Sequence, residues 1–165
     1  MLRQMEMIAA PDSDGDRDSW ATPDDLFRRL DSEFHFVHDI CAEAWSAKCE
    51  SFWTRHDDAF GRDWAGELTG FGWCNPPFSE LPAWVSAAGF EAQRGARIVM
   101  LLPAHRCEQE WFHRYVLDVA TEVRFIRKRV NYVPPPGITG DSAKFPSMIV
   151  VYDGPSTGAT TLGGL

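Results

Sequence analysis

The sequence predicts an α/β fold with a largely parallel sheet flanked by helices, and three observations lead to this prediction. Short apolar segments of strand character alternate along the chain with longer segments of helical periodicity. One apolar run, 97–102, is continuous, as is typical of a strand buried on both faces. An Asn-Pro-Pro turn directly follows another apolar segment, so that strand must end there. Strands that alternate with helices favour a parallel sheet covered by those helices.

The first helix is expected to begin after Thr22, a favourable N-cap residue, with Pro23 at the first helical position. The elements expected after it are, in order, a strand at 34–38, a short helical piece at 42–47, a short strand at 51–54, a strand at 70–74, a helix at 79–93, a strand at 97–102, a helix at 108–119, a strand at 122–127, a loop at 131–145 and a strand at 147–152. This order gives one helix-flanked sheet.

Length and composition favour a single domain. The chain has 165 residues, of which 44% are hydrophobic, enough for a sizeable core. Residues 1–18 are expected to be a flexible leader and 154–165 a flexible tail, because both are rich in small or polar residues; 19–153 then form the domain. The leader lacks the pattern of a signal peptide, and no apolar run approaches the ~20 residues that cross a bilayer. A cytoplasmic protein without a membrane partner is expected.

The charge distribution argues against a protein held on nucleic acid by bulk electrostatics, since the formal net charge is -8. Residues 1–90 carry 17 acidic and 7 basic side chains, whereas 91–165 carry 7 acidic and 9 basic ones. Part of the acidity is a run at 12–18 that is interpreted as a solvated tail. The four cysteines and five histidines show no zinc-like spacing, so no metal is expected.

The tetrapeptide Asn75-Pro76-Pro77-Phe78 is the most informative motif of the chain. The prolines stiffen the turn, while the Asn75 side-chain oxygen and the Pro76 carbonyl offer two acceptors. Two acceptors can bind both hydrogens of a planar exocyclic amine and free its lone pair for attack on a methyl sulfonium. Phe78 offers a flat face on which a base taken out of a helix can stack. A rigid turn without chemistry is the structural alternative.

Polar residues follow several of the predicted strands. Asp39, Asp58 and Asn75 each lie just after a strand or in the loop that follows it. Ligands of α/β sheets bind beyond the carboxyl ends of the strands, so these three side chains are expected to line one cleft.

The sequence resembles the phage-type, Dam-like DNA N6-adenine methyltransferases from about residue 20 to residue 152. The matching motifs are Trp20-Ala21-Thr22-Pro23, Asp39-Ile40-Cys41-Ala42, Asp58-Ala59-Phe60 with Trp64, Trp73-Cys74-Asn75-Pro76-Pro77-Phe78-Ser79, Leu101-Leu102-Pro103-Ala104 and Phe145-Pro146-Ser147-Met148. The resemblance implies a Rossmann-like S-adenosylmethionine-dependent methyltransferase fold. It also implies methyl transfer to adenine N6 in double-stranded DNA, with the target base flipped out, in a phage restriction-modification setting. Lys128-Arg129 and Phe60 depart from the usual family residues.

The resemblance also implies roles for individual residues. The residues expected to hold S-adenosylmethionine are Trp20, Thr22, Pro23, Asp39, Cys41, Ala42 and Asp58, and those expected to hold the target base are Asn75, Pro76, Pro77 and Phe78. Of the cofactor residues, Asp39 is expected at the methionine end and Asp58 near the adenosine. Structural alternatives are a helix start for Thr22 and Pro23, and turn positions for the two aspartates.

Arg127, Lys128, Arg129 and Asn131 are candidates for contact with DNA phosphates or the target sequence. In a strand, Arg127 and Arg129 share one face and Lys128 takes the other. The alternative is a solvated strand edge, where charges oppose aggregation.

Two other functions fit the same residues. Cytosine N4, RNA adenine and a protein glutamine amide all present a planar NH₂ that the tetrapeptide would also bind. A non-catalytic DNA-binding or decoy protein that kept the fold is a rival of another class, and the acidic balance suits a decoy.

Overall fold

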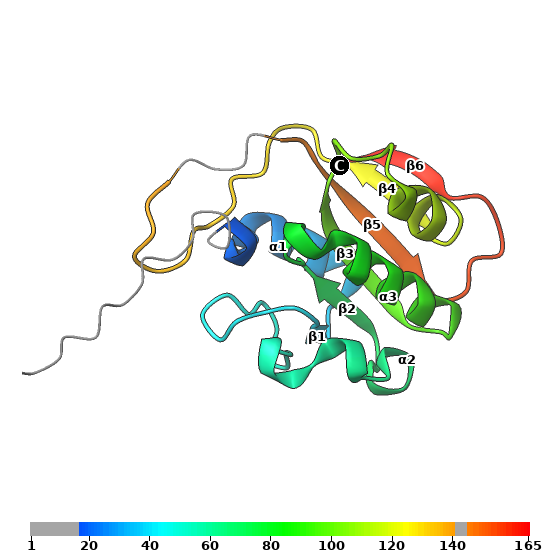
Figure 1. Cartoon of the computed structure of the whole chain (residues 1–165), viewed down its shortest axis with the longest axis horizontal. Helices are drawn as coiled ribbons and strands as arrows, with labels where there is room; N and C mark the ends of the chain where they lie inside the picture. The colour runs from blue at the N-terminus through cyan, green and yellow to red at the C-terminus, as the bar shows by residue number, and fades with distance from the viewer. Residues whose placement is uncertain (1–16, 141–144) are drawn as a thin grey trace, which may run out of the picture.

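A six-stranded sheet forms the centre of the computed structural model, which describes residues 17–140 and 145–165. In spatial order the strands are β1 (His38–Asp39), β2 (Phe71–Cys74), β3 (Arg97–Pro103), β5 (Ser147–Asp153), β4 (Glu122–Phe125) and β6 (Thr161–Gly164). The pairs β1–β2, β2–β3 and β4–β6 are parallel, whereas β5 is antiparallel to both its neighbours, β3 and β4. The sheet is therefore mixed, with β5 reversed against the common direction of the other strands (Figure 1).

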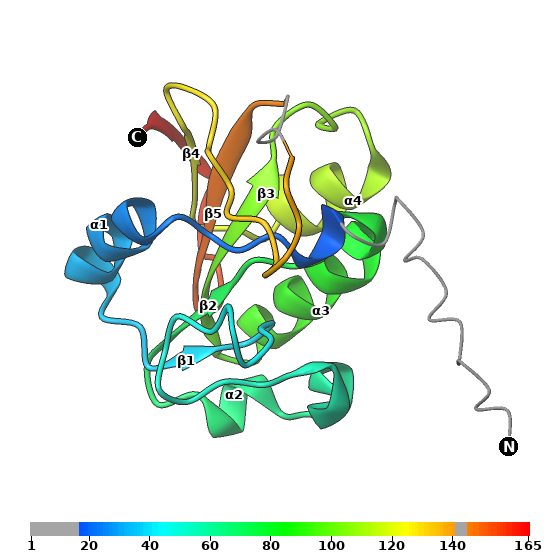
Figure 2. The same ribbon diagram turned by 90° about the vertical axis from the view of Figure 1, so that its left-hand side faces the viewer.

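Helices cover both faces of the sheet. Helix α1 (Asp24–Phe34) lies on one side, and α3 (Leu81–Gln93) and α4 (Glu110–Phe112) lie on the other, as Figure 2 shows. A π-helical turn, η5 (His113–Leu117), continues α4. The remaining short elements are η1 (Arg17–Ser19), η2 (Arg55–Asp57), η3 (Ala59–Gly61), α2 (Trp64–Glu67) and η4 (Phe78–Glu80). This is the helix-flanked α/β architecture that the sequence predicts.

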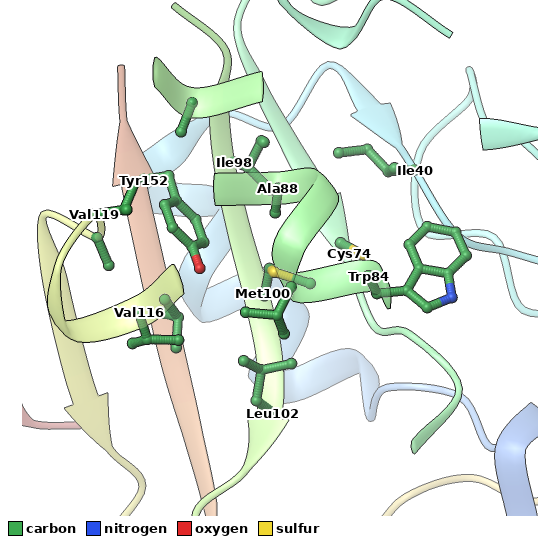
Figure 3. Close-up of a cluster of buried hydrophobic side chains, with 14 of the residues drawn as sticks. Ile40, Cys74, Trp84, Ala88, Ile98, Met100, Leu102, Val116, Val119 and Tyr152 are labelled. Carbon is green, nitrogen blue, oxygen red and sulfur yellow. The ribbon is translucent and has the colours of Figure 1, made fainter. Parts of the chain in front are cut away.

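The two faces of the sheet carry separate hydrophobic clusters. Ile98, Met100 and Leu102 of β3 point toward α3 and η5, where Ala88 and Val116 belong to the same cluster (Figure 3). The alternate residues of β3 pack instead against α1 on the opposite face. Both faces of β3 are thus buried, which explains why its sequence is apolar without alternation.

The N-terminal elements differ from the predicted ones. Helix α1 begins at Asp24, with Pro23 as its N-cap and no side-chain cap bond, so Thr22 is not the cap. The helix continues through Phe34 and ends at His35, which adopts a left-handed conformation with φ of 53°. The expected strand at 34–38 therefore shrinks to β1, because the phenylalanines that seemed to alternate belong to the helix end and to an aromatic stack.

Other predictions need smaller corrections. Residues 42–47 form a turn rather than a helix, and 51–54 contribute one isolated bridge, Asp39 to Phe52. The helix expected at 108–119 is the short α4 and the π-helical turn η5. Strand β4 ends at Phe125, and the residues after it form a bend in which Lys128 has φ of 141°. Arg127 and Arg129 therefore do not share a strand face.

The ends of the chain are more structured than expected. Residues 161–164 form β6, which pairs with β4, so the segment 154–165 is not a flexible tail over its whole length. The expected leader lies outside the described residues up to position 16, but Arg17–Ser19 forms η1 and Asp18 contacts Ser79. The interpretation of the acidic run as a solvated tail is wrong for Asp18.

Candidate active site

A cleft of about 480 Å³ lies beyond the carboxyl ends of β1 and β2, a size typical of small-molecule sites. Its walls come from the segment 18–22, the turn after β1, the loop around Asp58 and the Asn75 turn after β2. Asp39, Asp58 and Asn75 all line it, as their places after the strands predict. Parallel strands deliver these loops to one sheet edge.

Asp39 is the buried carboxylate at the base of the cleft, with 2% of its surface exposed. The backbone N–H groups of Cys41 and Lys48 donate to its two oxygens, at 3.4 and 3.0 Å. Burial raises the pKa of Asp39 to about 7, and these N–H donors offset part of that effect. A cationic ligand beside Asp39 would therefore favour the ionised form of its carboxylate.

The segment 18–22 forms one side of the cleft and contains two buried polar atoms without partners in the described part of the chain. Thr22 is 1% exposed, and its Oγ1 has no hydrogen-bond partner among the described residues; the same is true of the buried Trp20 Nε1. Both residues line the cleft. Buried polar atoms without a partner are uncommon in folded proteins, and a polar ligand would satisfy these.

Asp58 stands at the rim with an aromatic wall beside it. Its left-handed backbone (φ of 48°) is tolerated by aspartate more readily than by most residues, and Gly61 leaves room for its carboxylate, since a Cβ there would lie 2.8 Å from Oδ2. Trp53, Phe60 and Trp84 line the same part of the cleft, with Phe60 and Trp84 rings 4.6 Å apart. A carboxylate next to flat apolar surface suits a nucleoside, whose ribose donates hydroxyls and whose base stacks.

These features fit the polar groups of S-adenosylmethionine: an ammonium, a carboxylate, ribose hydroxyls and a purine. Cys41 and Ala42 also line the cleft at the turn after β1. Burial raises the pKa of the Cys41 thiol far above its ordinary value, so Cys41 is a neutral wall residue and not a nucleophile. Pro23 does not line the cleft; its carbonyl accepts from Phe27 N–H, 3.0 Å away, at the start of α1.

Asn75 is fixed in one orientation by the segment across the cleft. Its Nδ2 donates to the Trp20 carbonyl oxygen at 3.0 Å, and no described residue donates to its Oδ1. The amide oxygen is therefore left as an acceptor. The sequence motif predicted this acceptor but gave no sign that Trp20 holds it through the main chain.

Phe78 does not line the cleft, and its ring packs in an aromatic cluster made by distant parts of the chain. Its ring meets those of Tyr132 and Phe145 edge to face, with centroids 5.9 and 5.3 Å away, and His105 lies 5.2 Å from Phe145. The Tyr132 and Ser147 hydroxyls are 3.0 Å apart and fix the tyrosine. The tetrapeptide thus separates two environments: Asn75 and Pro77 face the cleft, Pro76 is buried, and Phe78 faces the aromatic cluster.

The candidate DNA-contacting residues lie at the same edge of the sheet, after β4. Arg127, Lys128, Arg129 and Asn131 are all exposed, and none lines the cleft. The segment that follows them returns toward the site, where Val133 pairs with Ala21 through two backbone hydrogen bonds of 2.8 and 2.9 Å (Figure 2). The basic bend and the cleft are joined by this short bridge.

Several site residues were not singled out from the sequence as cleft residues. Trp53, Ser79, Glu80 and Trp84 line the cleft, as does Asp18. Ser79, Glu80 and Trp84 follow the tetrapeptide closely, so proximity to the motif is a signal that could have found them. Asp18 carries no such signal, because its contact with Ser79 spans 61 residues.

The fold and the cleft define an α/β protein with a ligand-sized cleft at the carboxyl ends of its parallel strands. The sequence profile of the DNA N-6-adenine-methyltransferase (Dam) family matches residues 10–161. The chain therefore belongs to that family of DNA adenine-N6 methyltransferases, and the resemblance seen in the sequence motifs is confirmed.

Individual relatives agree with this assignment. The chain is 28% identical over 142 residues to the DNA N-6-adenine-methyltransferase of Haemophilus phage HP1, covering 84% of this chain and 80% of the relative. It is 29% identical over 100 residues to the enzyme of the same name from Escherichia phage T1, covering 60% and 41%. It is also 37% identical over 65 residues to the putative methyltransferase YfdM of Escherichia coli K12, covering 37% and 71%.

Within residues 17–140 and 145–165, no group of three or more His, Cys, Asp or Glu side chains is arranged to hold a metal ion. In the same residues, every helix is too short or too polar to span a bilayer.

Proposed function

We propose that this chain transfers the methyl group of S-adenosylmethionine to N6 of an adenine flipped out of double-stranded DNA. The observation that carries the proposal is the orientation of Asn75, whose Nδ2 is held by the Trp20 carbonyl so that Oδ1 is left to accept a hydrogen bond. An oriented acceptor beside a nucleoside-sized cleft is what an exocyclic amine needs for attack on a sulfonium methyl group.

The cofactor supplies an electrophilic methyl group on a sulfonium. The residues expected to hold it are Trp20, Thr22, Asp39, Cys41, Ala42 and Asp58. Among these, Asp39 would hold the ammonium, the Thr22 hydroxyl would donate to the carboxylate, and Asp58 would accept from the ribose hydroxyls. The pairing with Thr22 would satisfy a buried hydroxyl without a partner among the described residues, and the pairing with Asp39 would give a buried carboxylate a positive neighbour.

The tetrapeptide holds the acceptor base. Asn75 Oδ1 and the Pro76 carbonyl accept the two N6 hydrogens, which draws the nitrogen toward a tetrahedral shape and directs its lone pair at the methyl group. Phe78 stacks on the adenine, and Tyr132 and Phe145 keep the Phe78 ring in place. The methyl–sulfur bond breaks as the nitrogen–carbon bond forms, and N6 then loses one proton to solvent.

Arg127, Lys128, Arg129 and Asn131 are the proposed contacts to the DNA backbone. They are exposed, and the bend that carries them leads directly to Tyr132 and to the Val133–Ala21 bridge. DNA bound there would lie close to the catalytic turn. Phosphate contacts of this kind fix the register of the duplex without reading its sequence.

The test is methyl transfer from labelled S-adenosylmethionine to unmethylated duplex DNA, followed by digestion to nucleosides. Label in N6-methyladenine is expected, and the rate should fall by about 10²–10³-fold in Asn75→Ala. Binding of S-adenosylmethionine by that variant should stay within about threefold of the parent, because the cleft walls remain. Asp118→Asn, an exposed change on another face, is the matched control.

Other outcomes would replace the proposal. Label in N4-methylcytosine, in RNA or in a protein amide would keep the chemistry and change the acceptor. Cofactor binding without transfer to any acceptor would favour the decoy. The restriction-modification role has its own test: plasmid from cells that express the chain should resist an endonuclease blocked by N6-methyladenine, and plasmid from Asn75→Ala cells should be cut.

A further inference from the structure

Two carboxylates that the proposed reaction does not use lie beside the catalytic turn. Asp18 accepts from the Ser79 N–H at 3.1 Å and from the Ser79 hydroxyl. Glu80, the next residue, accepts from Trp84 Nε1 at 3.3 Å. Both line the cleft. Asp18 lies near Asn75, because it binds Ser79 while its near neighbour Trp20 accepts from Asn75 Nδ2. Glu80 follows Asn75 by five residues. The donors that hold each carboxylate are neutral, so neither carboxylate is balanced by an ion pair among the described residues.

The cationic side chains that line the cleft are already paired. Lys48 Nζ lies 2.6 Å from Asp24 Oδ1, and Arg55 Nε lies 2.7 Å from Glu43 Oε1. The cleft carboxylates that form no ion pair within the described part of the chain are Asp18, Asp39, Asp58 and Glu80. The cleft therefore has a surplus of negative charge without a counter-ion from the protein.

The position of Asp18 and Glu80 is important because the sulfonium of the cofactor must lie near Asn75. If the proposed function is right, the sulfonium methyl points at the base held by Asn75, so the sulfonium lies at that end of the cleft. S-adenosylmethionine carries a net positive charge through this sulfonium. The product, S-adenosylhomocysteine, has a neutral thioether in its place and differs in little else.

We infer that Asp18 and Glu80 are specificity-determining residues that favour the sulfonium substrate over its thioether product by charge. This inference rests on the proposed function. The carboxylates gain a counter-ion when S-adenosylmethionine binds and lose it when the methyl group leaves. The cleft therefore binds S-adenosylhomocysteine more weakly than S-adenosylmethionine, which speeds release of the product.

The expected difference in affinity between the two compounds follows from the strength of solvent-exposed ion pairs. Each such pair changes an affinity by about threefold, and the two together by about tenfold. Binding of S-adenosylmethionine should therefore be about tenfold tighter than that of S-adenosylhomocysteine at low salt, and the ratio should shrink toward one as salt screens the charges.

The experiment measures dissociation constants of both compounds by calorimetry on the full chain, at low and high salt. The variants are Asp18→Asn, Glu80→Gln and the double variant. Both amides keep an oxygen acceptor for the donors that now bind the carboxylates, so charge is removed with little change in shape. Sinefungin, in which an ammonium replaces the sulfonium, is a third ligand and should behave like the substrate.

The expected result is a ratio that falls about threefold in each single variant and to about one in the double variant. The control Glu108→Gln removes one charge from an exposed carboxylate that does not line the cleft, and should leave the ratio unchanged. Equal affinities in the parent, or a ratio unaltered in the double variant, would overturn this inference while leaving DNA methylation intact. Failure of the parent to bind either compound would overturn the proposed function as well.

Discussion

The cleft and the basic bend lie at the same edge of one sheet, but their charges are arranged in opposite ways. In the cleft, carboxylates such as Asp18 and Asp39 are held by N–H and O–H donors and form no ion pair among the described residues. In the bend, Arg127 and Arg129 are exposed and form no ion pair within the described chain. By contrast Arg124, inside β4, is neutralised by Glu33 and Glu122 at 2.6 and 2.8 Å.

The difference matches the charges of the two proposed ligands. A cationic cofactor suits a cleft of unpaired carboxylates, and a polyanionic duplex suits a bend of free cations. The bulk charge of -8 hides this division, because it sums over both regions. If the two regions act separately, a substitution in the bend should change DNA binding and leave cofactor binding unaltered.

The largest effect is expected from Asn75→Asp. In the cleft wall, Asn75 Nδ2 donates to the Trp20 carbonyl, and a carboxylate oxygen there would face an acceptor with nothing to donate. The catalytic rate should fall by about 10²-fold in labelled-methyl assays. The affinity for DNA should stay within about twofold, because the bend is untouched. Full activity in this variant would show that the Trp20 contact does not orient the amide.

The second effect concerns the bend. Arg127→Ala and Arg129→Ala should each weaken DNA binding by several-fold and lower the slope of log affinity against log salt by about one. Cofactor affinity should not change. Fluorescence anisotropy on duplex DNA across a salt series measures the slope. Arg114→Ala, on η5, is the matched control, and an equal loss there would mean that the bend has no special role.

The third effect is a pH dependence of stability and of cofactor binding, which should change in opposite directions. The pKa of Asp39 is raised from 3.8 to about 7, so the folded protein retains a proton that the unfolded chain has lost between those values. That contribution to stability is present at low pH and is lost as the pH rises toward 7. Binding of S-adenosylmethionine should instead strengthen from pH 6 to pH 8, as the carboxylate ionises.

Thermal unfolding and calorimetry measure the two trends. Asp39→Asn should remove both, whereas Asp58→Asn, at the exposed rim, should keep both. Cofactor binding that stays flat with pH in the parent would mean that Asp39 does not face the ammonium.

The smallest effect is expected from removal of residues 161–165. Strand β6 is exposed along its length, and its loss removes ladder bonds to β4 and the packing of Leu165. The free energy of unfolding should fall by about 1–2 kcal/mol, which lowers Tm by several degrees. Methyl transfer should persist. A protein that no longer folds would make β6 part of the essential domain.

The sequence predicted the layers of the fold and the convergence of Asp39, Asp58 and Asn75, because strand ends and an Asn-Pro-Pro turn are local signals. It did not predict the start of α1, since Thr22 has the side chain of a cap but is buried in the cleft wall instead. Strand β6 was missed because its short, glycine-containing sequence resembles a tail, and only pairing with β4 makes it a strand.

The candidate site, like the fold, could be predicted only in part from the sequence. Residues within the recognised motifs were found, whereas Ser79, Glu80 and Trp84 beside the tetrapeptide, and Asp18, were not identified as cleft residues. The Asp18–Ser79 and Trp20–Asn75 contacts join positions more than 50 residues apart, and no periodicity or spacing records such a pair. The basic residues were found, but their shared strand face was not, because β4 ends before them.

The reversed direction of strand β5 determines where the connection between β4 and β5 lies. Because β5 runs against β4, the segment that joins them leaves and re-enters the sheet at the edge where the cleft lies. Surface connections of this kind can lengthen at little entropic cost. Laboratory evolution of sequence specificity can therefore begin at residues 134–139 of this connection, while Tyr132, Val133 and Phe145, which contact Phe78 and Ala21, are kept.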